Sequence, residues 1–175
     1  MLGVIGGMGV EAGVNFDLAL QDRFQTIRSD AEHPCRVAAL SGTGPSPAAS
    51  IAQAALRLKE RGATHFVLAC MTAHAFLEEV QDLSGLSFIN VVDLVPTCTW
   101  FGTTVMAQTD LVKRFRLPTD KEQEIIQRAI WGVKVGDFSL APQVRQIASR
   151  YDNVIAGCTE LPLILGGYAP VDFIS

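Results

Sequence analysis

Two segments of the sequence share a plan that could support proton transfer at carbon. Each is a short apolar run that leads into a cysteine with a threonine close behind it, at Cys70 and at Cys158. Both runs read as strands followed by helices, and ligands of open α/β sheets bind beyond the carboxyl ends of the strands. Both thiols are therefore candidates for catalysis. Cys35 and Cys98 lack this setting and are expected to be packing residues.

The chemistry follows from what surrounds a thiol in such a place. A helix that begins just after the sulfur supplies backbone N–H groups and the positive end of a helix dipole, which favour a thiolate and a bound carboxylate. Two opposed thiols with a carboxylate between them could take a proton from one face of a carbon and return one to the other. We expect Cys70 and Cys158 to form this acid–base pair.

Two polar residues follow the cysteines at short spacing. His74 could pair with Cys70 as in a nucleophilic cysteine enzyme, but Ala69 and Met71 replace the glycines of a nucleophile elbow. A supporting polar or capping role for His74 is favoured. Glu160 is either a partner of Cys158 or an ordinary acidic residue in the first turn of a helix, and the sequence does not separate these readings.

A glycine-rich turn, residues 6–9, follows the first apolar run. It lacks a complete G-x-G-x-x-G and has no G-K-[ST], so a nucleotide site is disfavoured. Its glycines are better explained by close approach of the backbone to a small ligand.

The rest of the pattern alternates short apolar runs with amphipathic segments, which predicts an α/β fold with a mostly parallel sheet. Thr119 and Glu122 form a capping box at the start of a helix that Gly136 ends, and Pro162 falls in the first turn of a later helix. A further helix has Ser46 as its N-cap, Pro47 at its first position and Gly62 as its C-cap. We expect strands at 2–7, 36–40, 65–70, 87–92 and 153–158, and other helices at 11–28, 73–83 and 139–151.

Composition excludes several classes of protein. The chain has 175 residues, of which 49% are hydrophobic and 18% charged, so a sizeable core can form. The net charge of −4 and the lack of a basic stripe argue against nucleic acid and anionic membranes as partners. No apolar stretch approaches 18 residues, and neither the cysteines nor the histidines have metal-ligand spacing. We expect a cytoplasmic protein with reduced thiols and no bound metal.

The sequence resembles the aspartate/glutamate racemase family of cofactor-independent amino-acid racemases, and most closely its aspartate racemase branch. The matching segments run in family order over almost the whole chain, and the two Cys-Thr segments together are specific. They are residues 5–12 (IGGMGVEA), 32–34 (EHP), 69–76 (ACMTAHAF), 90–92 (NVV), 132–136 (GVKVG) and 156–162 (AGCTELP).

The resemblance implies two pseudo-symmetric α/β lobes with the active site in the cleft between them. The first lobe would be residues 1–95, which residues 168–175 could complete, and the second residues 96–167. The implied protein is a homodimer that needs no cofactor and racemises a small amino acid such as aspartate or glutamate. Cys70 and Cys158 would be its acid–base thiols. The implied substrate-binding residues are Gly7, Met8, Gly9, Met71, Thr72 and Thr159.

The chain also departs from the family pattern. Met71 stands where asparagine is usual and Val10 where proline is usual. The chain is shorter than its relatives after Ser41, between Val95 and Gly102, and after Leu111. Another cysteine enzyme of the superfamily, such as a hydantoin racemase or a dicarboxylate isomerase or decarboxylase, therefore stays open. So does a ligand-binding relative without catalytic activity.

Overall fold

The computed structural model describes residues 1–166, without the side chains of residues 10–12. The chain divides into two compact units, an N-terminal unit of residues 1–91 and a C-terminal unit that begins at Val92. Each unit is a parallel sheet flanked by helices, so the predicted α/β class is confirmed. Residues 168–175, which were expected to complete the first lobe, lie outside the described residues.

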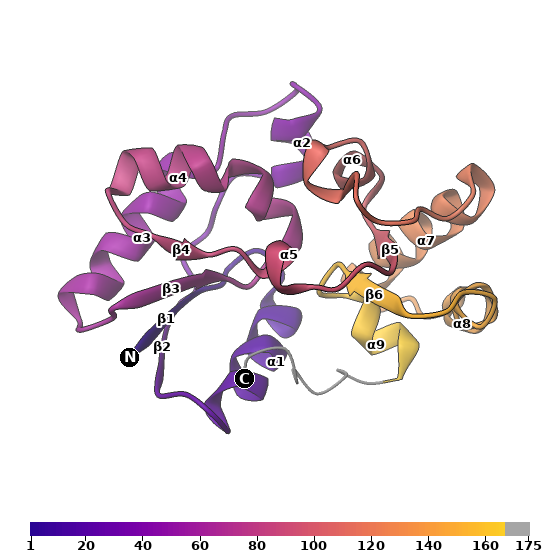
Figure 1. Ribbon diagram of the computed structural model, residues 1–175, viewed down its shortest axis with the longest axis horizontal. Coiled ribbons are helices and arrows are strands. Elements are labelled where there is room, and N and C mark those ends of the chain that lie inside the picture. The colour runs from indigo at the N-terminus through magenta and orange to yellow at the C-terminus, as the bar shows by residue number, and fades with distance from the viewer. Residues whose placement is uncertain (167–175) are drawn as a thin grey trace. The chain divides into compact units, whose positions relative to one another are not determined.

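Four parallel strands form the sheet of the N-terminal unit, in the order β2-β1-β3-β4 (Figure 1). They are β1 (Leu2–Ile5), β2 (Thr26–Ser29), β3 (His65–Leu68) and β4 (Phe88–Ile89). In register, Leu2 of β1 lies between Thr26 of β2 and His65 of β3. β1 and β3 are the central strands of this sheet, and both are apolar over most of their length, as is typical of buried parallel strands.

Helices cover both faces of this sheet. The helical segments of the unit are α1 (Val10–Gln21), α2 (Arg36–Leu40), α3 (Ala48–Glu60), the 3₁₀ helix η1 (Met71–Phe76) and α4 (Leu77–Ser84). Ile5, Phe66 and Leu68 pack against α3 and α4 on one face, and Val4 and Val67 pack against α1 on the other. Figure 1 shows α3 and α4 on one side of the strands and α1 on the opposite side.

The structure corrects two elements that the sequence suggested. Residues 11–28 are not one helix, because α1 ends at Gln21 and residues 26–29 form β2. Residues 36–40 are the helix α2 and not a strand. The position beside β1 that residues 36–40 were expected to take is occupied by β2. The prediction failed because an apolar run of five residues is too short for its periodicity to distinguish a helix from a strand.

Smaller differences concern the ends of elements. The helix expected from residue 73 begins as η1 and continues as α4. The strand expected at 87–92 is reduced to β4, and the chain then forms the short helix α5 (Val91–Leu94). The helix expected from Ser46 is α3, with Pro47 as its N-cap and Arg61 as its C-cap, each one residue from the predicted position.

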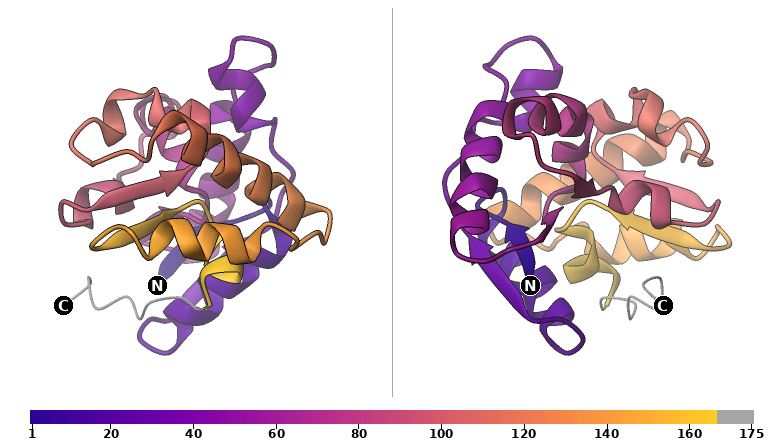
Figure 2. Two further views of the ribbon diagram at one scale, coloured as in Figure 1. Left: turned by 90° about the vertical axis from the view of Figure 1, so that its right-hand side faces the viewer. Right: turned by 60° about the vertical axis from the view of Figure 1, so that its left-hand side comes forward.

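In the C-terminal unit, the residues that the structure describes form two parallel strands, β5 (Thr99–Gly102) and β6 (Val154–Gly157). Its helical segments are α6 (Thr104–Ala107), η2 (Asp110–Val112), α7 (Asp120–Lys134), α8 (Ala141–Ala148) and α9 (Leu161–Leu165). Figure 2 shows α7 and α8 side by side. Phe101 of β5 lies in the core with Ile126 and Ile130 of α7 and Val144 and Ile147 of α8.

The other face of β5 carries a fully buried tryptophan. Trp100 stacks on Phe115, with 5.4 Å between the ring centroids. Its indole lies over Gly157, where an added Cβ would come within 2.3 Å of the ring. A glycine is therefore required at the residue that precedes Cys158.

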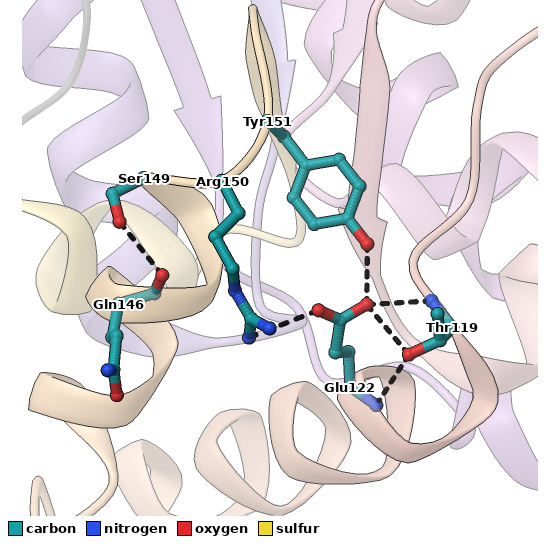
Figure 3. A network of polar contacts seen from close by, with 6 residues as sticks. All are labelled: Thr119, Glu122, Gln146, Ser149, Arg150 and Tyr151. Carbon is teal, nitrogen blue, oxygen red and sulfur yellow. Dashed lines mark hydrogen bonds and ion pairs between the residues drawn. The ribbon is translucent and has the colours of Figure 1, made fainter.

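The predicted capping box is present at the start of α7 and belongs to a larger network (Figure 3). The Glu122 carboxylate accepts hydrogen bonds from the Thr119 backbone N–H and hydroxyl, at 2.9 and 2.7 Å, and from the Tyr151 hydroxyl. Arg150 lies 3.1 Å from the other carboxylate oxygen. These contacts join the start of α7 to the segment that leads into β6.

Within residues 1–166, no helix combines the length and the apolar character needed to cross a membrane.

Candidate functional site

Cys70 lies just beyond the carboxyl end of β3. It has an extended backbone, precedes η1 and is 8% exposed. Its carbonyl accepts hydrogen bonds from the Ala73 backbone N–H at 3.1 Å and from Nδ1 of His74 at 3.0 Å. His74 thus holds the backbone of Cys70, which is a supporting contact and not a hydrogen bond to the thiol.

Met71 and Thr72 follow Cys70 within η1. Both side chains are buried. The predicted helix after the sulfur is therefore a 3₁₀ turn at this position, and it keeps the cysteine and the threonine within one short buried segment.

The glycine-rich turn connects β1 to α1 in the same unit. Gly7 has a φ of +72°, and a Cβ there would lie 2.0 Å from the carbonyl oxygen of Ala31. Met8 is buried, and its carbonyl accepts a hydrogen bond of 2.7 Å from Nη2 of Arg36. Gly9 is the N-cap residue of α1.

Arg36 is a site residue that the sequence reasoning missed. Nη1 donates to the carbonyl of Pro34 at 3.0 Å, and Nε has no hydrogen-bond partner among the described residues. The helix α2, which Arg36 opens, packs against η1 and so brings a guanidinium to the side of the unit that carries Cys70. Treating residues 36–40 as a strand hid this residue, although it comes two positions after the quoted segment 32–34.

Arg36 contributes to a shift in the pKa of the nearby His33. Burial, together with the charges of Arg36 and Arg57, lowers the pKa of His33 to about 4. His33 is therefore neutral at physiological pH, with Nδ1 within 2.8 Å of the Ser50 hydroxyl.

Cys158 lies just beyond the carboxyl end of β6 and is 7% exposed. Its thiol donates to Oε2 of Glu160 at 2.8 Å, and the Thr159 hydroxyl lies 3.4 Å from the same oxygen. Glu160 is itself buried and is the N-cap residue of α9, which begins at Leu161. Of the two readings of Glu160 left open by the sequence, the structure shows the contact with Cys158.

A lysine completes this arrangement. Nζ of Lys134, the last residue of α7, lies 3.7 Å from Oε1 of Glu160. The Glu160 carboxylate therefore faces an ammonium group on one oxygen and a thiol on the other. Lys134 lies within the quoted segment 132–136, but the sequence reasoning assigned it no role.

The two cysteines thus occupy equivalent places in their own units, beyond the end of a parallel strand and with similar burial. Within the described part of the chain, no group of three His, Cys, Asp or Glu side chains is arranged to hold a metal ion. Burial raises the pKa of Cys98. Cys35 is exposed, so the expectation that it is a packing residue is wrong.

The fold places the chain in a class of α/β proteins with known structures. The chain has the parallel α/β fold of a solved aspartate racemase and of two solved proteins described as its relatives, which confirms at the level of fold the resemblance carried by the sequence. No family model matches the sequence.

The individual similarities are as follows. Aspartate racemase from Picrophilus torridus is 24% identical, with a TM-score of 0.78 over 93% of this chain and 82% of that one. An aspartate racemase homologue from Pyrococcus horikoshii is 21% identical, with a TM-score of 0.68 over 93% and 87%. A Yersinia pestis protein assigned as an Asp/Glu racemase is 18% identical, with a TM-score of 0.65 over 97% and 91%.

Proposed function

We propose that this protein belongs to the aspartate/glutamate racemase family and racemises a small acidic amino acid by two-base proton transfer. The observation that carries the proposal is the pair of buried thiols beyond the ends of β3 and β6, on a fold shared with aspartate racemases. A protein that only binds a ligand needs neither thiol. A hydantoin racemase or a dicarboxylate isomerase is the alternative within catalysis.

The proposed reaction uses one thiol on each face of the substrate Cα. A thiolate removes the Cα proton, and the C–H electron pair passes into the adjacent carboxylate as an enediolate. The thiol of the other cysteine then donates its proton to the opposite face. Cys70 and Cys158 exchange their protonation states in each turnover, so the reaction requires no cofactor.

Charged and polar groups in both units support an acidic substrate. Arg36, held by the Met8 carbonyl beside the glycine-rich turn, would attract a substrate carboxylate in the N-terminal unit. The threonines that follow the cysteines, Thr72 and Thr159, would donate hydrogen bonds from their hydroxyls.

Met71 bears on which amino acid is preferred. Its buried thioether stands beside Cys70 at a position where an amide would offer N–H donors. We propose that this apolar contact is part of the substrate pocket, together with Gly7, Met8 and Gly9. The preferred substrate would then have a less polar side chain, where it contacts Met71, than the substrate of a relative with asparagine at this position.

The direct test is to incubate the protein with L-aspartate and L-glutamate, without added cofactor, and to separate the enantiomers by chiral chromatography. Cys70→Ser and Cys158→Ser should each reduce the rate by about 10² to 10⁴, because each removes one proton-transfer step. Cys98→Ser is the matched control and should be nearly silent. Near-normal turnover in either of the first two variants would remove that thiol from the mechanism.

A further inference from the structure

The two proposed catalytic thiols differ in what they contact. The Cys158 thiol donates to Oε2 of Glu160 at 2.8 Å. Cys70 Sγ has no hydrogen-bond partner among the described residues, and the nearby His74 contacts its carbonyl. Both cysteines are almost equally buried, at 8% and 7% exposed. Burial therefore does not distinguish the two thiols, whereas the carboxylate does.

The Glu160 carboxylate has two further polar neighbours. Oε1 lies 3.7 Å from the Lys134 ammonium on α7, and the Thr159 hydroxyl lies 3.4 Å from Oε2. Both oxygens of this carboxylate therefore have a polar neighbour besides the backbone of α9. In the hydrogen bond between Cys158 and Glu160, the sulfur is the donor and Oε2 is the acceptor.

Among the described residues, the charged side chains that α7 and α8 direct toward α9 and its N-cap contact other groups. β6 and α9 contain no titratable side chain. α8 directs Arg145 to the carbonyl of Ile164, near the far end of α9, at 2.7 Å. α7 provides Lys134, which is already paired with Glu160. Removing the proton from Cys158 would place a thiolate against a carboxylate, and like charges in contact disfavour ionisation.

We propose that Glu160 is a positioning residue that keeps Cys158 protonated in the resting protein, so that Cys70 is the resting base. This inference rests on the proposed function and adds a direction to it. The resting form accepts the enantiomer whose Cα–H faces Cys70: the C–H bond breaks, an S–H bond forms on Cys70, and the Cys158 S–H bond breaks as the new C–H bond forms. Glu160 remains a carboxylate throughout.

Thiol alkylation tests the proposal without relying on turnover. Iodoacetamide reacts with the thiolate, so brief labelling of the wild-type protein at neutral pH, with peptides quantified by mass spectrometry, compares the two sites. We expect Cys70 to be labelled about tenfold faster than Cys158, and the Cys158 rate to keep rising at higher pH after the Cys70 rate has levelled off. Equal rates with the same pH dependence would overturn the proposal, and this result needs no variant.

Substitution then identifies the group responsible. In Glu160→Gln, which is nearly isosteric, Cys158 labelling should accelerate about tenfold while Cys70 labelling is unchanged. Glu160→Asp, which keeps the charge, should restore slow labelling. Glu124→Gln, at an exposed position on α7, is the control and should change neither rate. A Glu160→Gln protein with a wild-type circular dichroism spectrum and unchanged Cys158 labelling would contradict the assignment.

The two proposals can fail separately. If no amino acid is racemised but the labelling contrast is present and depends on Glu160, the proposed function fails and the control of Cys158 by Glu160 stands. If racemisation is normal and the contrast is absent, the two-thiol reaction stands and Glu160 loses its assigned role.

Discussion

At the scale of single residues, Gly7 is the position where the backbone of the candidate site is most constrained. Its φ of +72° lies in the left-handed region, and a Cβ would meet the Ala31 carbonyl oxygen at 2.0 Å. That oxygen belongs to the backbone, so no side-chain rotation can relieve the contact. The turn that presents Met8 therefore depends on the absence of a side chain at this residue.

We expect Gly7→Ala to lower the free energy of unfolding by about 2–4 kcal/mol, from left-handed strain and the steric contact together. Urea denaturation followed by circular dichroism measures this. Gly42→Ala is a matched control, because Gly42 has a similar φ of +70° but nothing within 4 Å of its Cβ position. The Gly42→Ala protein should lose only the part of the unfolding free energy that comes from left-handed backbone strain. Equal losses in the two variants would show that the turn has room for a side chain.

At the scale of elements, the Glu122 network joins the start of α7 to the segment before β6 (Figure 3). Lys134 at the end of α7 and Cys158 after β6 both contact Glu160. The Tyr151 hydrogen bond, and then those from Thr119, lower the pKa of Glu122 from 4.5 to about 2. The same hydrogen bond raises the pKa of Tyr151. The network is therefore stable only while Glu122 is ionised.

The sign of the pH dependence follows from this lowered pKa. Because the folded pKa lies below the ordinary value, the stabilisation is complete above about pH 4.5 and is lost as the pH falls toward 2. Glu122→Gln should remove this acid-side slope and reduce stability at neutral pH by about 1–3 kcal/mol. Thermal unfolding monitored between pH 2 and 7 checks both effects. A wild-type slope in the Glu122→Gln protein would assign it to other carboxylates.

Trp100 and Gly157 couple β5 to β6 at the residue before Cys158. A Cβ on Gly157 would lie 2.3 and 2.4 Å from two ring carbons of an indole that is fully buried. Gly157→Ala should therefore reduce stability by about 1–3 kcal/mol through overpacking.

The double variant Trp100→Leu with Gly157→Ala tests the cause. Leucine would make room for the methyl group, so the alanine should cost less in the leucine background than in the wild type. Chemical denaturation of the four proteins of this cycle provides the coupling energy. Additive losses would mean that the alanine acts through another neighbour.

At the scale of the whole molecule, the proposed reaction takes one thiol from each unit. If the two thiols act on opposite faces of the substrate Cα, the thiol that protonates the second face has already exchanged its proton with solvent. In D₂O the product enantiomer should carry deuterium at Cα from the first turnovers, while the remaining starting enantiomer stays largely protiated. Mass spectrometry after chiral separation measures this. Equal early deuteration of both enantiomers would indicate a single base.

Much of the fold could be predicted from local signals. The buried runs of β1 and β3, the capping box at Thr119, the stop at Gly136 and the proline at the start of α9 each depend on a few neighbouring residues. The placement of both thiols just after strands followed from the same runs. These elements were predictable because hydrophobic periodicity and capping act over one or two turns.

Other features were decided only by tertiary structure. Residues 36–40 form α2 and not a strand, because β2 already pairs with β1 at the place that this strand would take. Which segment pairs with β1 is decided by the packing of the sheet and not by the local apolar run. Arg36 reaches the Met8 carbonyl, and Lys134 reaches Glu160, across 28 and 26 positions in sequence. Spacing along the chain carries no information about such contacts, because they form only when separate elements pack. The sequence by itself determined which cysteines follow strands, because apolar runs are local. Packing decided which charged groups lie near those cysteines, because such contacts join distant elements.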